Sequence, residues 1–155
     1  MEAHRIRCNH LTVKLIVDAS FLLECIQRKI DIVEKLEERL NSKVKLVILK
    51  PVYDEILRLS TGSNRKSHYA RLAIQLLNRI EADLVDVNGK EPVDTLIEQY
   101  ACKFKIPVAT NDLNLRKRLT QSGIPVLYVR GLSKIDVDHG EYLGMVKGLR
   151  DQQYR

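Results

Sequence analysis

Four acidic residues, far apart along the chain, stand where strands are expected to end or helices to begin: Asp18, Glu55, Asp94 and Asp112. Open parallel sheets bind their ligands beyond the carboxyl ends of the strands, so side chains at these positions are the first candidates for chemistry. Carboxylates gathered there repel one another, and a divalent cation would neutralise them. Mg²⁺ and Mn²⁺ prefer carboxylate oxygens, and such a site can activate water for displacement at phosphorus.

Each of these carboxylates also has a purely structural interpretation. An Asp that precedes a helix commonly caps it, and a carboxylate in the first turn, where we expect Glu55, is favoured by the helix dipole. Capping accounts easily for any one of the four, but less easily for four at one edge of a sheet. The spacing alone leaves both interpretations open.

The elements that must position these acids follow from two alternating periods in the sequence. Short β-branched runs are followed by longer stretches with apolar residues at helical spacing. Strands are expected over 13–17, 44–49, 84–87, 106–110 and 124–129, and helices over 21–26, 30–40, 52–59, 69–80, 92–104 and 113–121. The small, polar and basic residues of 60–67 predict a loop. Repeated strand–helix alternation predicts a three-layer α/β/α fold with a mainly parallel central sheet.

The length of 155 residues suits one domain with its own hydrophobic core. We expect 1–12 to be an N-terminal arm, 13–131 the domain, and 132–155 a C-terminal extension that is either a short docked helix or a mobile tail. The phosphate-binding patterns GxxxxGK[ST] and GxGxxG are absent from the sequence, which argues against P-loop hydrolysis and dinucleotide redox chemistry.

The cysteines and the apolar runs exclude other classes of protein. Three cysteines without a CxxC pair predict neither a disulfide framework nor a zinc ribbon, and His4, Cys8 and His10 lack a fourth ligand at finger spacing. The run LIVDASFLLECI is too short and too acidic for a signal peptide or a membrane span. We therefore expect a cytoplasmic protein with no membrane partner.

Four segments of the sequence resemble the motifs of PIN-domain nucleases: VDASFLL (17–23), LKPVYDEILRLS (49–60), VDTLIEQYA (93–101) and VATNDLNLRKRL (108–119). Their order, their spacing and the surrounding apolar residues agree with that family. The following GIPVLYVRG (123–131) is similar to the last strand of an archaeal branch that resembles Fcf1/Utp24-like and VapC-type ribonucleases. The resemblance covers about 13–131, and ATNDLNLRKRL is its most specific part.

The resemblance implies a PIN-like fold and a metal-dependent endonuclease that cuts single-stranded RNA in RNA processing or decay, including maturation of ribosomal RNA. Two alternatives stay open: a VapC-like toxin blocked by an antitoxin, and a non-catalytic RNA-binding scaffold. The ribosomal role would bring a ribosome-assembly protein as partner. Because dimers are common among relatives, a homodimer is also expected.

Carried over position by position, the resemblance implies catalytic roles for Asp18, Glu55, Asp94 and Asp112, metal binding by Asp18, Asp94 and Asp112, and support from Ser20, Thr110 and Asn111. Glu55 is chosen over Asp54 because the register of PVYDEILRL matches a Glu before two apolar residues. Many relatives carry further acids where this chain has Thr95 and Asn114. We therefore expect one Mg²⁺ or Mn²⁺ position and leave a second open.

Basic residues suggest where RNA would lie. The net charge of +6 favours a polyanionic partner, because phosphate contacts by Lys and Arg release counterions. The expected RNA-binding residues are Arg65, Lys66, Arg116, Lys117 and Arg118, although the last three would equally form a solvated helix face. Tyr69 is a candidate for stacking on bases, whereas Tyr53 and Tyr100 have the helical spacing of core residues.

Overall fold

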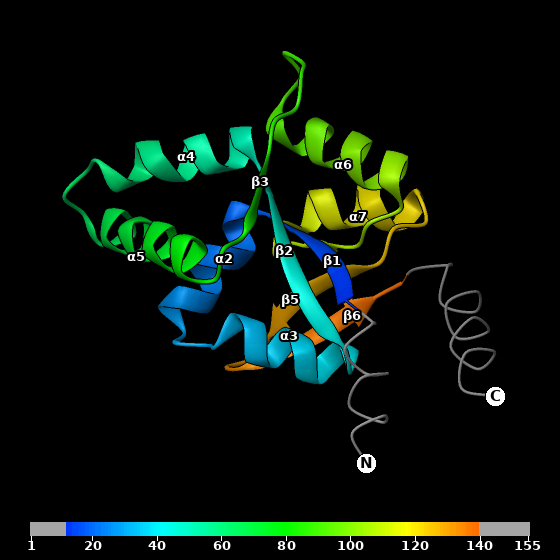
Figure 1. Cartoon of the computed structure of the whole chain (residues 1–155), viewed down its shortest axis with the longest axis horizontal. Coiled ribbons are helices and arrows are strands. Elements are labelled where there is room, and N and C mark those ends of the chain that lie inside the picture. Colours follow the sequence, from blue (N-terminus) through cyan, green and yellow to red (C-terminus); the bar gives the residue numbers. More distant parts are fainter. Residues whose placement is uncertain (1–11, 140–155) are drawn as a thin grey trace.

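A six-stranded sheet forms the centre of the protein in a computed structural model that describes residues 12–139 (Figure 1). The strand order is β3-β2-β1-β4-β5-β6, with β1 to β5 parallel and β6 antiparallel to β5. The strands are β1 (Thr12–Val17), β2 (Lys43–Leu49), β3 (Asp83–Val85), β4 (Val108–Ala109), β5 (Val126–Arg130) and β6 (Lys134–Asp138). The expected α/β class with a mainly parallel central sheet is confirmed.

Six helices cover this sheet: α2 (Ala19–Gln27), α3 (Ile32–Leu40), α4 (Lys50–Ser60), α5 (Arg65–Arg79), α6 (Val93–Phe104) and α7 (Leu113–Gln121). Helices α6 and α7 lie together on one side of the sheet, and α2, α4 and α5 group on the other (Figure 1). Helix α3 packs against β2 and β6. None of the described helices is long and apolar enough to span a bilayer.

The core lies where the strands approach their carboxyl ends. Leu15, Ile16 and Val17 of β1 are all fully buried, and the last four residues of β2 are buried as well. Consecutive buried residues in a strand require cover on both faces, as in parallel sheets between two helical layers. Phe21 and Ile97 supply part of that cover from α2 and α6.

The order of the strands creates a switch point beside β1. The chain runs from β1 outward to β2 and β3, and then returns to place β4 on the other side of β1. Ile16 and Val17 pair with Val108 and Ala109, and the Asp18 backbone N–H donates to the Ala109 carbonyl at 2.9 Å. Ligands of open α/β sheets bind at such points, so the side chains that follow β1 and β4 face the expected site.

Three helices begin earlier than the sequence predicts: α2 at Ala19, α4 at Lys50 and α5 at Arg65. The expected loop over 60–67 is shorter, because Asn64 caps α5 by accepting hydrogen bonds from the Ser67 N–H at 2.8 Å and its hydroxyl at 2.9 Å. Arg65 and Lys66 therefore lie in the first turn of a helix. Helix α4 begins at Lys50, which puts Glu55 in the second turn and removes the dipole explanation for it.

The segment after residue 131 also differs from expectation. Residues 134–138 form neither a docked helix nor a mobile tail. They pair with β5 as strand β6. Gly131, with a φ of +64°, occupies the left-handed region that the turn between the two strands requires. His4, Cys8 and His10 lie outside the described residues, as does the chain beyond 139.

Candidate active site

Asp18 is held by two hydroxyl groups at the carboxyl end of β1. Ser20 Oγ and Thr110 Oγ1 each donate a hydrogen bond to Asp18 Oδ2 at 2.8 Å. Thr110 is fully buried, and Asp18 is only 6% exposed. Although Asp18 occupies the N-cap position of α2, its side chain makes no capping hydrogen bond. Within the described part of the chain, Oδ1 accepts no hydrogen bond and can therefore serve a ligand.

Asp112 combines a structural role with its place at the site. Its Oδ1 caps α7 by accepting from the N–H groups of Asn114 at 2.9 Å and Leu115 at 3.3 Å. Its own N–H donates to Thr110 Oγ1 at 3.1 Å, which ties it to the hydroxyl group that holds Asp18. The capping interpretation is thus correct for one oxygen of Asp112 and wrong for Asp18.

Glu55 on α4 and Asp94 on α6 are coupled electrostatically to the acids of this site. Burial raises the pKa of Glu55, and the negative charges of Asp18 and Asp94 raise it further. Burial also raises the pKa of Asp94, with Asp18 and Asp112 adding to the effect. Each of the four carboxylates thus interacts with at least one other, although they come from four separate segments. The structure brings together the four acids that the sequence singles out.

The neighbouring residue Asp54 has different surroundings from Glu55. Its carboxylate pairs with Lys50 Nζ at 3.2 Å on the surface of α4. Glu55, by contrast, interacts electrostatically with Asp18 and Asp94. Asp54 is therefore a matched control for Glu55.

The donor set suits a hard divalent cation. Four carboxylates supply only oxygen ligands, and their mutual repulsion is what a cation relieves. Within residues 12–139, no group of three or more His, Cys, Asp or Glu side chains is placed closely enough to hold a metal ion together. Mg²⁺ needs no such group, because it keeps several waters and commonly binds through one or two carboxylates and substrate phosphates.

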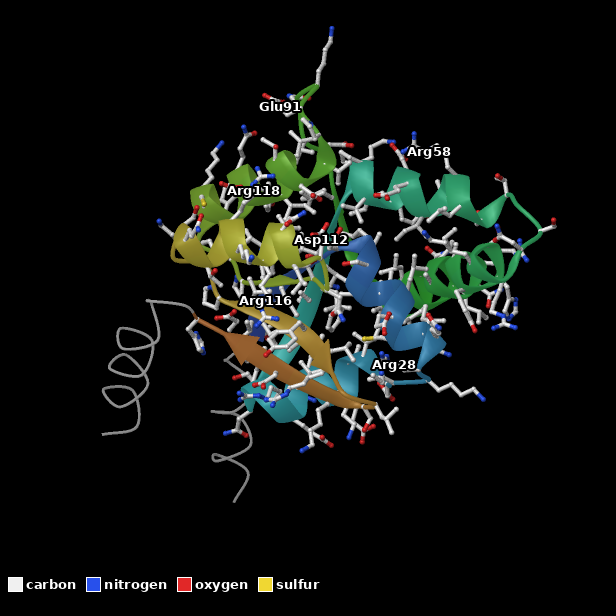
Figure 2. All side chains as sticks on the ribbon, turned by 180° about the vertical axis from the view of Figure 1, so that it is seen from behind. Arg28, Arg58, Glu91, Asp112, Arg116 and Arg118 are labelled. Carbon is white, nitrogen blue, oxygen red and sulfur yellow. The ribbon has the colours of Figure 1, made fainter. Side chains whose placement is uncertain are left out.

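The basic run of α7 divides between two sides of the helix (Figure 2). Arg118 faces α6, where it contacts Glu98 Oε2 at 2.7 Å and Thr95 Oγ1 at 3.1 Å, and its charge lowers the pKa of Asp94. Arg116 instead lies over the Tyr128 ring at 3.8 Å and pairs with Asp138 at 2.8 Å. Lys117 is exposed. Arg118 is thus the residue of this run whose charge acts on Asp94.

One basic residue near the acids was not singled out from the sequence. Arg58, on α4, lowers the pKa of Glu55 (Figure 2). Its position three residues after Glu55, on a neighbouring part of the same helical face, is the signal that could have identified it. Arg71, by contrast, donates to the carbonyls of Ser60 and Gly62 and holds the connection between α4 and α5.

Asn111 supports the site through its backbone. Its N–H donates to Ser20 Oγ at 3.0 Å, which fixes the hydroxyl that contacts Asp18. Its side-chain oxygen accepts from the Val129 N–H at 2.9 Å, so the amide extends the pairing with β5. The Asn111 amide is therefore engaged with Val129, whereas the Thr110 hydroxyl contacts Asp18 directly.

A cleft of about 530 Å³ opens beside the acids, between α2 and α5. We call it the α2–α5 cleft; it is lined by Ser20, Leu23, Glu24, Gln27, Arg65, Lys66, Tyr69 and Asn111. A larger hollow of about 1000 Å³ lies at the β5–β6 turn. None of the four acids lines either hollow, but Ser20, which donates to Asp18, lines the α2–α5 cleft. The α2–α5 cleft therefore adjoins the candidate site through Ser20.

Two tyrosines considered for RNA stacking and the buried Cys25 have surroundings that indicate a structural role. Tyr53 and Tyr100 are half-buried and pack against the core, and Tyr100 contacts the Phe104 ring at a centroid distance of 4.6 Å. Cys25 is buried, and burial raises the pKa of its thiol to about 12. A thiol with such a pKa is unreactive at neutral pH.

Removing one of the crowded charges should stabilise the metal-free protein. We expect Glu55→Gln and Asp94→Asn each to raise Tm at pH 7 by about 1–3 °C, a small effect because solvent screens partly exposed carboxylates. A raised pKa means that folding favours the protonated carboxyl. The charged carboxylate therefore destabilises the fold. This destabilisation is absent below the pKa that the group has in the unfolded chain and complete above its pKa in the folded protein.

Thermal unfolding in a chelator at pH 7 and near pH 4 measures this effect, which should shrink at the lower pH. Asp54→Asn, which removes a surface pair with Lys50, should not raise Tm. A lower Tm for both site variants at pH 7 would contradict the proposed crowding.

Comparisons with known proteins agree with this geometry. Residues 15–132 match the family described as PIN like domain. Ribonuclease VapC4 of Methanocaldococcus jannaschii is 32% identical over 119 residues, covering 76% of this chain and 90% of the relative. Ribonuclease VapC9 of Archaeoglobus fulgidus is 30% identical over 139 residues, covering 89% and 98%.

Solved structures show the same fold. The PIN domain endonuclease Utp24 superposes with a TM-score of 0.70 at 30% identity, over 81% of this chain and 91% of that chain. The VapBC2 structure from Rickettsia felis gives a TM-score of 0.56 at 16% identity, over 76% of this chain and all of the matched chain, and indicates the fold alone. By its matched residues, its relatives and its strand order, this chain belongs to the PIN-like domain family.

Proposed function

We propose that this protein is a metal-dependent endoribonuclease that hydrolyses phosphodiester bonds of single-stranded RNA. The observation that carries the proposal is the meeting of Asp18, Glu55, Asp94 and Asp112 at the switch point of the sheet. Membership of the family, with two relatives named as ribonucleases and a structural neighbour named as an endonuclease, supports the same reaction class.

Asp18, Asp94 and Asp112 would hold Mg²⁺ or Mn²⁺, which when bound polarises phosphate oxygens and lowers the pKa of water. Ser20 and Thr110 fix the orientation of Asp18 through its Oδ2. Glu55, whose pKa is raised, is suited to accept a proton from the attacking water at its carboxylate. Arg58, Lys66 and Arg118 place positive charge near the acids and would stabilise the anionic substrate.

Cleavage of labelled single-stranded RNA with Mn²⁺ or Mg²⁺ tests this function. We expect cleavage by the wild type, none with a chelator, and loss of cleavage in Asp94→Asn. The control Asp54→Asn should cleave like the wild type, because Asp54 pairs with Lys50 on the surface. Equal cleavage by the wild type and Asp94→Asn would sink the assignment of the acids. Intact RNA binding without cleavage would instead identify a scaffold.

Lys66 should contribute to binding of the RNA backbone. It is exposed in the first turn of α5, and its charge lowers the pKa of Glu55. Each phosphate neutralised on a single strand steepens the dependence of log K on log salt by about 0.7, so Lys66→Ala should flatten that slope by about this amount. Fluorescence anisotropy across a salt series measures it. Lys43→Ala, at the opposite end of the parallel strands, should leave the slope unchanged.

Two cellular roles fit this activity. The 30% identity with the Utp24 endonuclease supports a role in ribosomal RNA maturation. The relatives named Ribonuclease VapC support a toxin that a partner antitoxin blocks. Overexpression distinguishes the two: growth arrest that Asp94→Asn relieves would favour the toxin. Normal growth with altered ribosomal RNA precursors would favour maturation.

A further inference from the structure

The α2–α5 cleft shares residues with the candidate active site. Ser20 lines it and also donates to Asp18 Oδ2. Lys66 lines it and also interacts electrostatically with Glu55. Whatever occupies the cleft therefore lies directly beside the position of the scissile phosphate. This inference rests on the proposed function for the identity of that phosphate.

The two walls of the cleft differ in chemistry. Helix α5 contributes the charges of Arg65 and Lys66 and the half-buried ring of Tyr69. Helix α2 contributes the apolar side chain of Leu23 and the polar ends of Glu24 and Gln27. A basic edge, an aromatic ring and hydrogen-bonding groups are what proteins use to bind one unpaired nucleotide. The volume of about 530 Å³ falls within the range of roughly 300–1,000 Å³ for small-ligand sites.

Glu24 gives the cleft a preference among base edges. Arg28 Nε donates to its Oε1, whereas its Oε2 accepts no hydrogen bond within the described part of the chain. A carboxylate only accepts, so it favours a base edge that presents donor hydrogens. Guanine presents N1–H and N2–H side by side, and its O6 can accept from the Gln27 amide. Uracil instead places two carbonyl oxygens around its single N3–H.

From this arrangement we propose that the α2–α5 cleft binds the base of one nucleotide next to the scissile phosphate, stacked on Tyr69, and that Glu24 and Gln27 make it prefer guanine over uracil. The protein is accordingly a sequence-biased nuclease. Its bias resides in α2 and α5, outside the four acids.

Binding of two fluorescently labelled RNA hexamers, UUUGUU and UUUUUU, to the full chain in a chelator tests the proposal without cleavage. We expect the wild type to bind the guanine-containing hexamer about five- to tenfold more tightly. Glu24→Gln should remove most of this difference, and Tyr69→Ala should weaken binding of both hexamers. Tyr69→Phe, which keeps the ring, should bind as the wild type does. Gln27→Ala should reduce the preference for guanine, whereas Gln75→Ala, at an exposed glutamine elsewhere on α5, should keep it.

Equal affinity of the wild type for the two hexamers would overturn the proposal. So would a preference that survives both Glu24→Gln and Tyr69→Ala in folded protein, with folding checked by Tm. Cleavage of the same hexamers with Mn²⁺ reports separately on the proposed function. If the wild type binds the guanine-containing hexamer more tightly but cuts neither hexamer, the proposed nuclease activity is refuted and the proposed base-binding role of the cleft stands.

Discussion

Asp18→Asn is expected to lower kcat for RNA cleavage by about a thousandfold. A bound metal ion stabilises a phosphoryl transition state by several kcal/mol, and a loss of about 4 kcal/mol corresponds to a thousandfold lower rate. Asn keeps the size of the side chain and an oxygen that can accept from Ser20 and Thr110, but it removes the negative charge. The loss should therefore be one of chemistry with the fold intact. Single-turnover kinetics at saturating protein, with Tm measured in parallel, separate the two.

Asp31→Asn is the matched control for this substitution. Asp31 also precedes a helix and caps α3 by accepting from the Glu34 N–H at 3.2 Å, but it lies outside the acid cluster. Asn is an equally good cap, so both activity and stability should stay near wild type. A kcat for Asp18→Asn within tenfold of the wild type would remove Asp18 from the catalytic set.

Phe21→Ala is expected to lower the free energy of unfolding by about 3–5 kcal/mol. The side chain is fully buried, and its removal leaves a cavity between the sheet and α2. Because α2 begins directly after Asp18, the same substitution should also loosen the placement of that carboxylate and reduce activity in the protein that remains folded. Urea unfolding measures the first effect, and cleavage rates at low temperature measure the second.

Phe104→Ala provides the comparison for the same chemical change on the surface. Its side chain is 51% exposed and contacts mainly the Tyr100 ring, so we expect a loss of about 1 kcal/mol. Activity should not change. Similar losses for the two Phe variants would mean that α2 is not anchored by Phe21 as the structure indicates.

The order of the elements from β1 to β5 could be predicted from the sequence, because it depends on local patterns. The choice of the four acids rests on the resemblance to PIN-domain nucleases, and their roles stay a prediction. Alternating periods mark strands and helices wherever each strand is a short β-branched run. The register of PVYDEILRL, matched to the pattern of that family, predicts Glu55 as the site acid, and the structure places Asp54 in a surface pair with Lys50. The start of α5 was missed because the capping power of Asn64 depends on the Ser67 N–H reaching its side chain.

The tertiary structure decided which partner each side chain has. Thr110 holds Asp18, 92 residues away, only because β4 lies beside β1 at the switch point. For the same reason the Asn111 amide pairs with Val129 and not with a carboxylate, and Arg116 lies over Tyr128.

The sequence by itself determined the fold class, and its resemblance to PIN-domain nucleases predicts four carboxylates that would share a cation. Only the tertiary structure decided that Asp18 is held through one oxygen by Ser20 and Thr110, and that a basic and aromatic cleft opens beside it. The physical reason is that hydrogen bonds and burial depend on distances between segments far apart in the chain. Those distances are fixed by strand order, which no local pattern specifies.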